Sequence, residues 1–119
     1  MKAVAVALAT VAVLAACGGS GSWQPPGSTK VTLSEFKFEP SSLTVAHGKV
    51  VFWLVNSGSV AHDLAIRDSS GNRIAVSELL AAGDTKEFDV SNIDAGSYVI
   101  FCTQPGHEGS GMKGTLTVT

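Results

Sequence analysis

The sequence predicts an all-β fold, a single-domain Greek-key β-sandwich of seven or eight strands over residues 30–119. Three observations lead to this prediction. Short apolar runs, several of which alternate with polar residues, recur along this part of the chain, as is typical of strands. Clusters of Gly, Pro, Asn, Asp and Ser separate these runs at short intervals, which favours a sandwich. No long run has the periodicity of a helix.

The first half of this region contains three predicted strands. Residues 31–38 alternate in polarity, with a shift near Glu35 that indicates a bulge or bend. Residues 43–46 form the next predicted strand, and residues 47–49 form a turn. Residues 50–55 are apolar on both faces, so we expect this strand to lie deep in the sandwich.

The second half contains the remaining strands. Residues 74–80 fit either a strand or a helical turn, whereas four other segments have clearer strand patterns. These are residues 63–67, 85–90, 97–101 and 113–118. Tyr98 follows Ile-Asp-Ala-Gly-Ser and resembles a tyrosine corner, whose hydroxyl hydrogen-bonds back to the chain. The alternative is a simple packed tyrosine.

The N-terminus has the features of an export and anchoring segment. Residues 1–16 combine Lys2 with an apolar run of signal-peptide length. The sequence Leu-Ala-Ala before Cys17 resembles the lipobox of bacterial lipoproteins. This resemblance implies cleavage before Cys17, lipidation of that residue and an extracytoplasmic protein anchored to a bacterial membrane. The alternatives are an unmodified Cys17 or a disulfide between Cys17 and Cys102.

Residues 17–29 form a predicted linker between this anchor and the folded domain. Gly and Ser make the segment flexible, and two adjacent prolines stiffen its middle. Trp23 fits either a position at the lipid interface or a loose contact with the domain. Charged residues make up only 15% of the chain and the formal net charge is −2. This composition excludes a typical nucleic-acid-binding protein and a disordered chain, and we expect a monomer.

The most informative stretch for function is residues 101–114, FCTQPGHEGSGMKG. It places Cys102, His107 and Met112 at even intervals among glycines and a proline, which disfavour a helix and allow a loop to bring three side chains together. Any one of these residues alone could be incidental, because Cys and Met often only fill the core. Together, thiolate, imidazole and thioether suit copper, and a His₂Cys site with a weak axial Met is the blue-copper pattern.

This pattern requires a second histidine, and the chain offers two. His62 follows the apolar strand in a turn-rich segment, and we assign it to the site. His47 lies in a predicted hairpin turn and is interpreted as an ordinary surface residue. Glu108 is interpreted as a solvent-facing loop charge.

Residues 98–118, YVIFCTQPGHEGSGMKGTLTV, resemble the C-terminal copper loop of cupredoxins, in particular azurin, auracyanin and plastocyanin. The segment from Asn56 to His62 resembles the region of the first copper ligand in that family. The resemblance implies that His62, Cys102, His107 and Met112 bind one type 1 copper.

The resemblance also implies supporting residues around these ligands, namely Asn56, Asp63 and Thr103. Asp63 stands where cupredoxins usually carry Asn, and in the family this side chain bonds to the residue after the Cys, here Thr103. An ionised Asp63 would favour Cu(II) and lower the reduction potential. The alternative is a solvated turn carboxylate.

The predicted function is that of a membrane-anchored blue copper protein that carries single electrons between redox-partner proteins and is not an enzyme. With four protein ligands the copper has no open position for a substrate. Copper trafficking or storage, an oxidase-type copper domain and a metal-free immunoglobulin-like adhesion module are alternatives. The first two fit poorly because they use more Cys, Met or His residues or a longer chain than this one.

The two histidines are expected to differ in exposure. His107 lies in a loop, and loops run over the surface, whereas His62 follows an apolar strand and should lie deeper. We therefore predict that electrons leave through His107. A small apolar docking face would surround it, formed by Val60, Pro105, Gly106 and Gly111.

Overall fold

A computed structural model describes residues 23–119, which contain nine strands and no helix. The predicted signal peptide and Cys17 lie outside the described residues. The strands are β1 (Thr29–Ser34), β2 (Lys37–Glu39), β3 (Ser42–Val45), β4 (Gly48–Asn56), β5 (Ala65–Arg67), β6 (Arg73–Val76), β7 (Thr85–Ile93), β8 (Gly96–Phe101) and β9 (Lys113–Val118). No helix long and apolar enough to cross a membrane occurs in residues 23–119.

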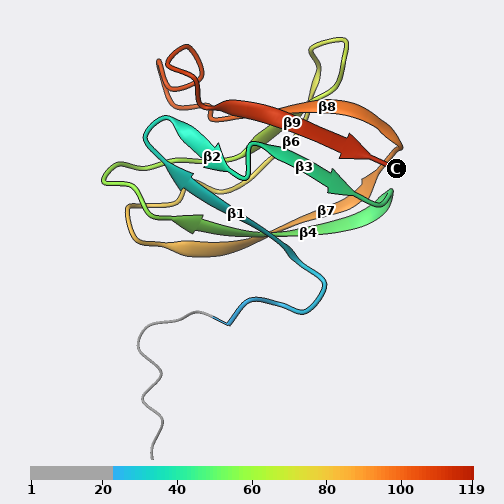
Figure 1. Ribbon diagram of the computed structural model, residues 1–119, viewed down its shortest axis with the longest axis horizontal. Helices are drawn as coiled ribbons and strands as arrows, with labels where there is room; N and C mark the ends of the chain where they lie inside the picture. Colours follow the sequence, from blue (N-terminus) through green and yellow to red (C-terminus); the bar gives the residue numbers. More distant parts are fainter. Residues whose placement is uncertain (1–22) are drawn as a thin grey trace, which may run out of the picture.

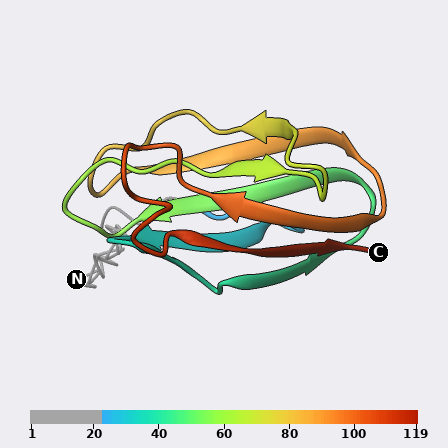
Figure 2. The same ribbon diagram turned by 90° about the horizontal axis from the view of Figure 1, so that it is seen from above.

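The strands form two sheets packed face to face (Figure 1). One sheet has the order β2-β1-β4-β7 and the other β3-β9-β8-β5-β6. Pairing is mixed, because β1 runs parallel to β4 and β3 parallel to β9, while the other pairs are antiparallel. Seen from above, strands of both layers run broadly along the length of the molecule (Figure 2). The predicted β-sandwich is therefore confirmed.

The count of nine strands exceeds the predicted seven or eight for two local reasons. The run over residues 31–38 divides into β1 and β2, which pair as a hairpin around Glu35 and Phe36. The expected irregularity near Glu35 is thus a complete turn. The ambiguous segment after residue 73 begins with a strand, β6, which pairs with β5.

The expectation that β4 lies deep on both faces is wrong. Val50, Phe52 and Leu54 are buried, but the alternate residues Val51 and Trp53 are only half-buried. The buried face points to the other sheet, and the apolar residues on the other face remain partly open to solvent. Antiparallel and mixed sheets commonly have one solvated face, so an apolar outer face does not require a further layer.

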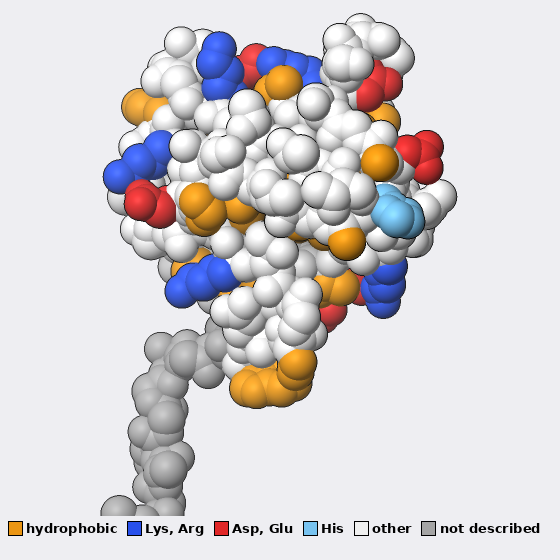
Figure 3. Space-filling model, turned by 45° about the vertical axis from the view of Figure 1, so that its right-hand side comes forward, with side chains coloured by type: hydrophobic (Ala, Val, Ile, Leu, Met, Phe, Trp, Pro, Cys, Tyr) orange, Lys and Arg blue, Asp and Glu red, His pale blue; other side chains and the backbone are white. Residues whose placement is uncertain are grey.

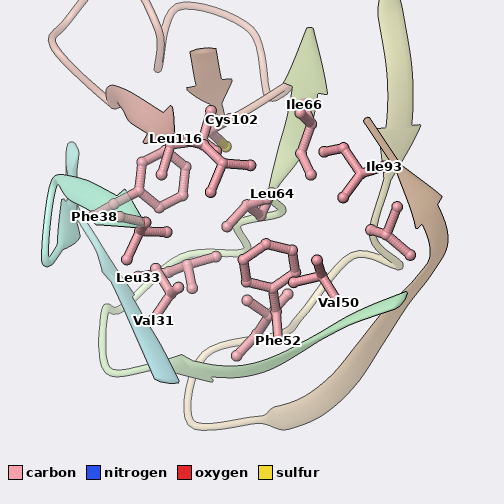
Figure 4. Close-up of a cluster of buried hydrophobic side chains, with 14 of the residues drawn as sticks. Val31, Leu33, Phe38, Val50, Phe52, Leu64, Ile66, Ile93, Cys102 and Leu116 are labelled. Atoms are coloured by element: carbon pink, nitrogen blue, oxygen red, sulfur yellow. The ribbon is translucent and has the colours of Figure 1, made fainter. Parts of the chain in front are cut away.

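The core lies between the two sheets and receives side chains from both (Figure 4). Phe52 and Leu33 come from one sheet, and Ile66 and Leu116 from the other. Cys102 belongs to the same buried cluster, so the thiol that was predicted to bind copper is part of the core.

Tyr98 forms the predicted tyrosine corner. Its hydroxyl donates to the Asp94 carbonyl at 2.7 Å, across the connection between β7 and β8. These two strands belong to different sheets, so this bond fastens a crossover of the sandwich.

Three segments meet at one end of the sandwich, on the left in Figure 1. They are the β1–β2 turn, the connection from β4 to β5, and the long loop between β8 and β9. His47 lies elsewhere, beside the C-terminus, where its Nδ1 is 2.8 Å from the Thr119 carbonyl oxygen. The fold therefore separates His47 from the four other candidate ligands.

The surface carries few large apolar side chains. On the face shown in Figure 3, acidic and basic side chains are interspersed, with hydrophobic groups between them. The exposed large hydrophobic residues among those described are Trp23, Phe36, Val60, Ile74, Val76 and Leu79. Trp23 is the most exposed of them at 74%, so it makes little contact with the domain.

Candidate metal centre

Three of the predicted ligands converge. His62 Nδ1 lies 3.2 Å from His107 Nδ1, and Cys102 Sγ lies 3.6 Å from the same His107 nitrogen. One donor atom from each residue lies within 4.8 Å of the others. Two imidazole nitrogens and a thiol sulfur therefore face a common point, although they come from two segments of the chain.

His62 is held by both its backbone and its surroundings. It forms an isolated bridge with Leu80, in which the two residues exchange backbone hydrogen bonds of 3.0 and 2.9 Å. Its side chain is fully buried. This burial confirms that His62 lies deeper than His107, which is half-buried.

Asn56 organises the segment that leads to His62. Its Nδ2 donates to the carbonyls of Val60 and Leu80 at 2.9 and 3.0 Å, and its Oδ1 accepts from the Gly58 N–H at 2.9 Å. The residue is 1% exposed, so each bond is shielded from water and worth more than at the surface. Asn56 therefore shapes the turn and ties it to the Leu80 strand bridge.

The loop from Cys102 to Met112 is shaped mainly by its own backbone. The N–H of His107 bonds to Gln104 and that of Met112 to His107, while Cys102 bonds to Met112 at 3.2 Å. Gly106 and Gly111 have φ of 78° and 111°, a conformation that glycine adopts far more readily than other residues. The loop thereby brings the backbone of the buried Met112 back to that of Cys102.

Asp63 and Thr103 join the two segments. The Thr103 N–H donates to Asp63 Oδ1 at 2.7 Å, and the Thr103 hydroxyl donates to Oδ2. Asp63 is only 5% exposed, so the alternative of a solvated turn carboxylate is wrong. The expected hydrogen bond between these residues is present. Its acceptor is a carboxylate, where the family resemblance described above gives the amide of an Asn as the usual acceptor.

Glu35 is a site residue that the sequence analysis missed. Its Oε1 lies 3.0 Å from His62 Nε2 and accepts hydrogen bonds from the N–H groups of Ser59 and Val60. The bond to His62 is the main cause that lowers the pKa of Glu35 to about 2. The only sequence signal was the break in alternation near Glu35, which indicated a bend but not its position beside a histidine.

Glu108 is not the free, solvent-facing charge that we expected. It is half-buried and forms an ion pair with Arg67 on β5. The Arg67 guanidinium also lies over the Phe101 ring, 4.5 Å from its centroid. The contact crosses from the ligand loop to a strand 41 residues away in sequence, which local pattern could not reveal.

Comparison with known proteins places the chain in a family. The family model described as a cupredoxin-like domain matches residues 5–118. The chain belongs to the cupredoxin family. A plastocyanin of Scenedesmus fuscus is 40% identical over 89 residues, covering 68% of this chain and 85% of the relative. Auracyanin-A of Chloroflexus aurantiacus is 30% identical over 156 aligned residues, covering 99% of this chain and 96% of the relative.

A solved structure agrees with this cupredoxin assignment. The structure of auracyanin A, described as a "blue" copper protein from Chloroflexus aurantiacus, superposes with a TM-score of 0.64. It is 25% identical in sequence, and the match covers 76% of this chain and 99% of that one.

The donor set of this cupredoxin fits a copper ion. Soft thiolate and borderline imidazole donors converge at the site. Met112 is fully buried, and its backbone is hydrogen-bonded to those of Cys102 and His107. Burial raises the pKa of the Cys102 thiol in the metal-free protein. A bound cation must therefore displace a proton that the protein alone retains.

The solvent side of this cupredoxin site is apolar. The Phe36 ring packs edge-on against the His107 ring with centroids 5.1 Å apart, and Val60 is 44% exposed. Pro105, Gly106 and Gly111 are also exposed. Phe36 was not among the residues expected at this face, because its position in the β1–β2 turn depends on the hairpin.

Proposed function

We propose that this cupredoxin is a single-electron carrier whose one type 1 copper is held by His62, Cys102, His107 and Met112. Bound copper would supply a Cu(II)/Cu(I) couple, with Met112 as the weak axial ligand. The observation that carries this proposal is the convergence of His62 Nδ1, His107 Nδ1 and Cys102 Sγ within 4.8 Å of one another.

The rigidity of the donors favours electron transfer over catalysis. Backbone hydrogen bonds hold His62, Cys102 and His107 in place, and Glu35 Oε1 lies 3.0 Å from His62 Nε2. Preorganised donors need little rearrangement when the charge of the site changes, and a site filled by protein ligands offers no place for substrate. Burial of His62 and Cys102 also opposes the ready metal release that a trafficking protein requires.

Exposure of the two histidines favours His107 as the exit for electrons. Its ring is half-buried and is flanked by Phe36 and Val60, whereas His62 has no exposed surface. A small apolar face with few charges suits brief encounters with redox proteins.

The ligand assignment is tested by adding Cu(II) to the metal-free protein. An intense blue absorption that saturates at one copper per chain is expected, because thiolate-to-copper charge transfer dominates such sites. Cys102→Ala should abolish the colour. His47→Ala is the matched control, since His47 lies beside the C-terminus, and it should leave the spectrum unchanged. Colour without Cys102, or its loss without His47, would overturn the assignment.

We also propose that residues 1–16 are a lipoprotein signal peptide and that Cys17 carries the lipid. Residues 17–29 would then link the membrane to the domain of residues 30–119. The high exposure of Trp23 supports a linker that stands away from the domain. Mass spectrometry of membrane fractions should find a lipidated N-terminal Cys17, and Cys17→Ser should remain soluble or unprocessed. An unmodified Cys17 on released protein would contradict the anchor.

A further inference from the structure

The carboxylate of Glu35 contacts the side of the His62 ring that faces away from the other donors. His62 Nδ1 is directed at His107, and His62 Nε2 is 3.0 Å from Glu35 Oε1. The two residues are 27 positions apart in sequence, so this contact exists only because the β1–β2 turn packs against the segment before His62. The side chain of Glu35 is 33% exposed and that of His62 is fully buried.

The surroundings of this carboxylate are shaped around it. The N–H groups of Ser59 and Val60 donate to the same Oε1 at 2.8 and 3.1 Å. A methyl group on Gly58 would approach Oε1 to 2.3 Å and His62 Nε2 to 3.0 Å, so only glycine lets the turn close over the pair. Two backbone N–H groups therefore donate to one oxygen, and a ring nitrogen lies within hydrogen-bond distance of it. Such an arrangement stabilises an ionised carboxylate.

The contact has a consequence for the histidine. A neutral imidazole has one N–H and one lone pair, and the hydrogen bond at one nitrogen decides which is which. An acceptor at Nε2 keeps the proton there and leaves the Nδ1 lone pair free for a metal. Carboxylate partners of this kind also make the imidazole a stronger donor to the metal.

We propose that Glu35 is a positioning residue of the copper site, which fixes His62 with a free Nδ1 and lowers the reduction potential by stabilising the more positive Cu(II) state. The effect on the reduction potential rests on the proposed function. The fixing of His62 concerns the metal-free protein alone, so the two parts of the proposal can fail separately.

The metal-free test measures the tautomer of His62 by ¹⁵N NMR of the imidazole at neutral pH. In the unchanged protein, we expect the proton on Nε2 with a shift typical of a strong hydrogen bond. In Glu35→Ala the Nε2 shift should lose the signature of a strong hydrogen bond, or the proton should move to Nδ1. A proton on Nδ1 in the unchanged protein would overturn the positioning role, whatever the metal does.

The loaded-protein test compares reduction potentials by voltammetry. Glu35→Gln keeps the shape and an acceptor oxygen but removes the charge, so the potential should rise. The expected rise corresponds to about a tenfold loss of preference for Cu(II) over Cu(I), or about 59 mV for one electron. Glu39→Gln removes the same charge from the neighbouring strand, where Glu39 is exposed and 3.8 Å from Lys37, and should have little effect.

Gly58→Ala provides a second route that keeps the net charge. The added methyl displaces the Glu35 carboxylate from His62, so the potential should rise while the blue colour remains. Equal potentials for Glu35→Gln and Glu39→Gln would overturn the tuning role. If the unchanged protein binds copper without a blue spectrum, the proposed function fails instead, and the NMR result still decides the tautomer.

Discussion

The two segments that supply the metal donors are held in different ways. The segment of residues 56–63 is fixed by its own Asn56 and by contacts with Glu35 and Leu80 from elsewhere in the chain. The loop of residues 102–112 is fixed mainly by hydrogen bonds within itself. A methyl group on Gly58 would collide with its neighbours, whereas one on Gly109 would lie 3.8 Å from the nearest atom, the Gly106 carbonyl oxygen.

This difference assigns a separate task to each segment. The first is packed against the sandwich and presents a fully buried histidine, so it forms the enclosed side of the site. The second lies on the surface and presents a half-buried histidine, so we expect partners to reach the metal from this side. The bonds from Thr103 to Asp63 join the two.

The largest expected effect comes from removing one histidine from each segment. His107→Gly and His62→Gly should both lose the blue spectrum. Added imidazole should restore it in His107→Gly, because this position opens to solvent, and much less in His62→Gly, because that position is enclosed. Titration with imidazole, followed by visible absorption, measures the difference. Equal rescue of both variants would contradict the distinction between an enclosed His62 and an accessible His107.

How far the sequence could predict this site depends on the same difference. Cys102, His107 and Met112 lie in one short loop, so their spacing revealed them without any knowledge of the fold. His62 was assigned through family resemblance and its place after an apolar strand. The loop's backbone turns follow from its own glycines, which is why its shape was predictable.

Contacts between distant segments were not predictable in this way. Glu35 reaches His62 only after β1 and β2 form a hairpin, and Arg67 reaches Glu108 only across the sheet. Nothing local distinguishes these charges from ordinary surface residues. The same limit explains the β4 error, because an apolar run shows which residues can be buried but not which face meets the other sheet.

The next largest effect concerns the fixed segment. Asn56→Ala should lower the free energy of unfolding of the metal-free protein by about 2–3 kcal/mol, because it removes the three hydrogen bonds of a buried side chain. Urea unfolding measures this. Asn72→Ala is the control, since Asn72 is exposed and bonds only within a turn to Asp68, and it should change stability by under about 0.5 kcal/mol. Similar losses of stability in both variants would show that Asn56 does not organise the segment that leads to His62.

A smaller effect is expected where the two segments join. Asp63→Asn keeps an oxygen that can accept from the Thr103 N–H but removes a buried negative charge near the metal donors. The potential should rise by tens of millivolts, because a negative charge stabilises Cu(II) over Cu(I), while the blue colour persists. Voltammetry beside Asp68→Asn, which removes a half-buried charge in the β5–β6 turn, provides the comparison. An unchanged or lower potential would contradict the electrostatic role of Asp63.

The smallest effect should come from the contact between the surface loop and β5. Arg67 and Glu108 are partly exposed, at 27% and 34% of their side chains, so solvent screens their attraction and a coupling of under about 1 kcal/mol is expected. A double-mutant cycle with Arg67→Ala and Glu108→Ala, followed by urea unfolding, isolates this coupling from the stacking of Arg67 on Phe101. The copper spectrum should survive in all three variants, because the loop's own hydrogen bonds keep Cys102 and His107 in place. A coupling well above that value, or loss of colour in Arg67→Ala, would show that the loop depends on the sheet as strongly as the His62 segment does.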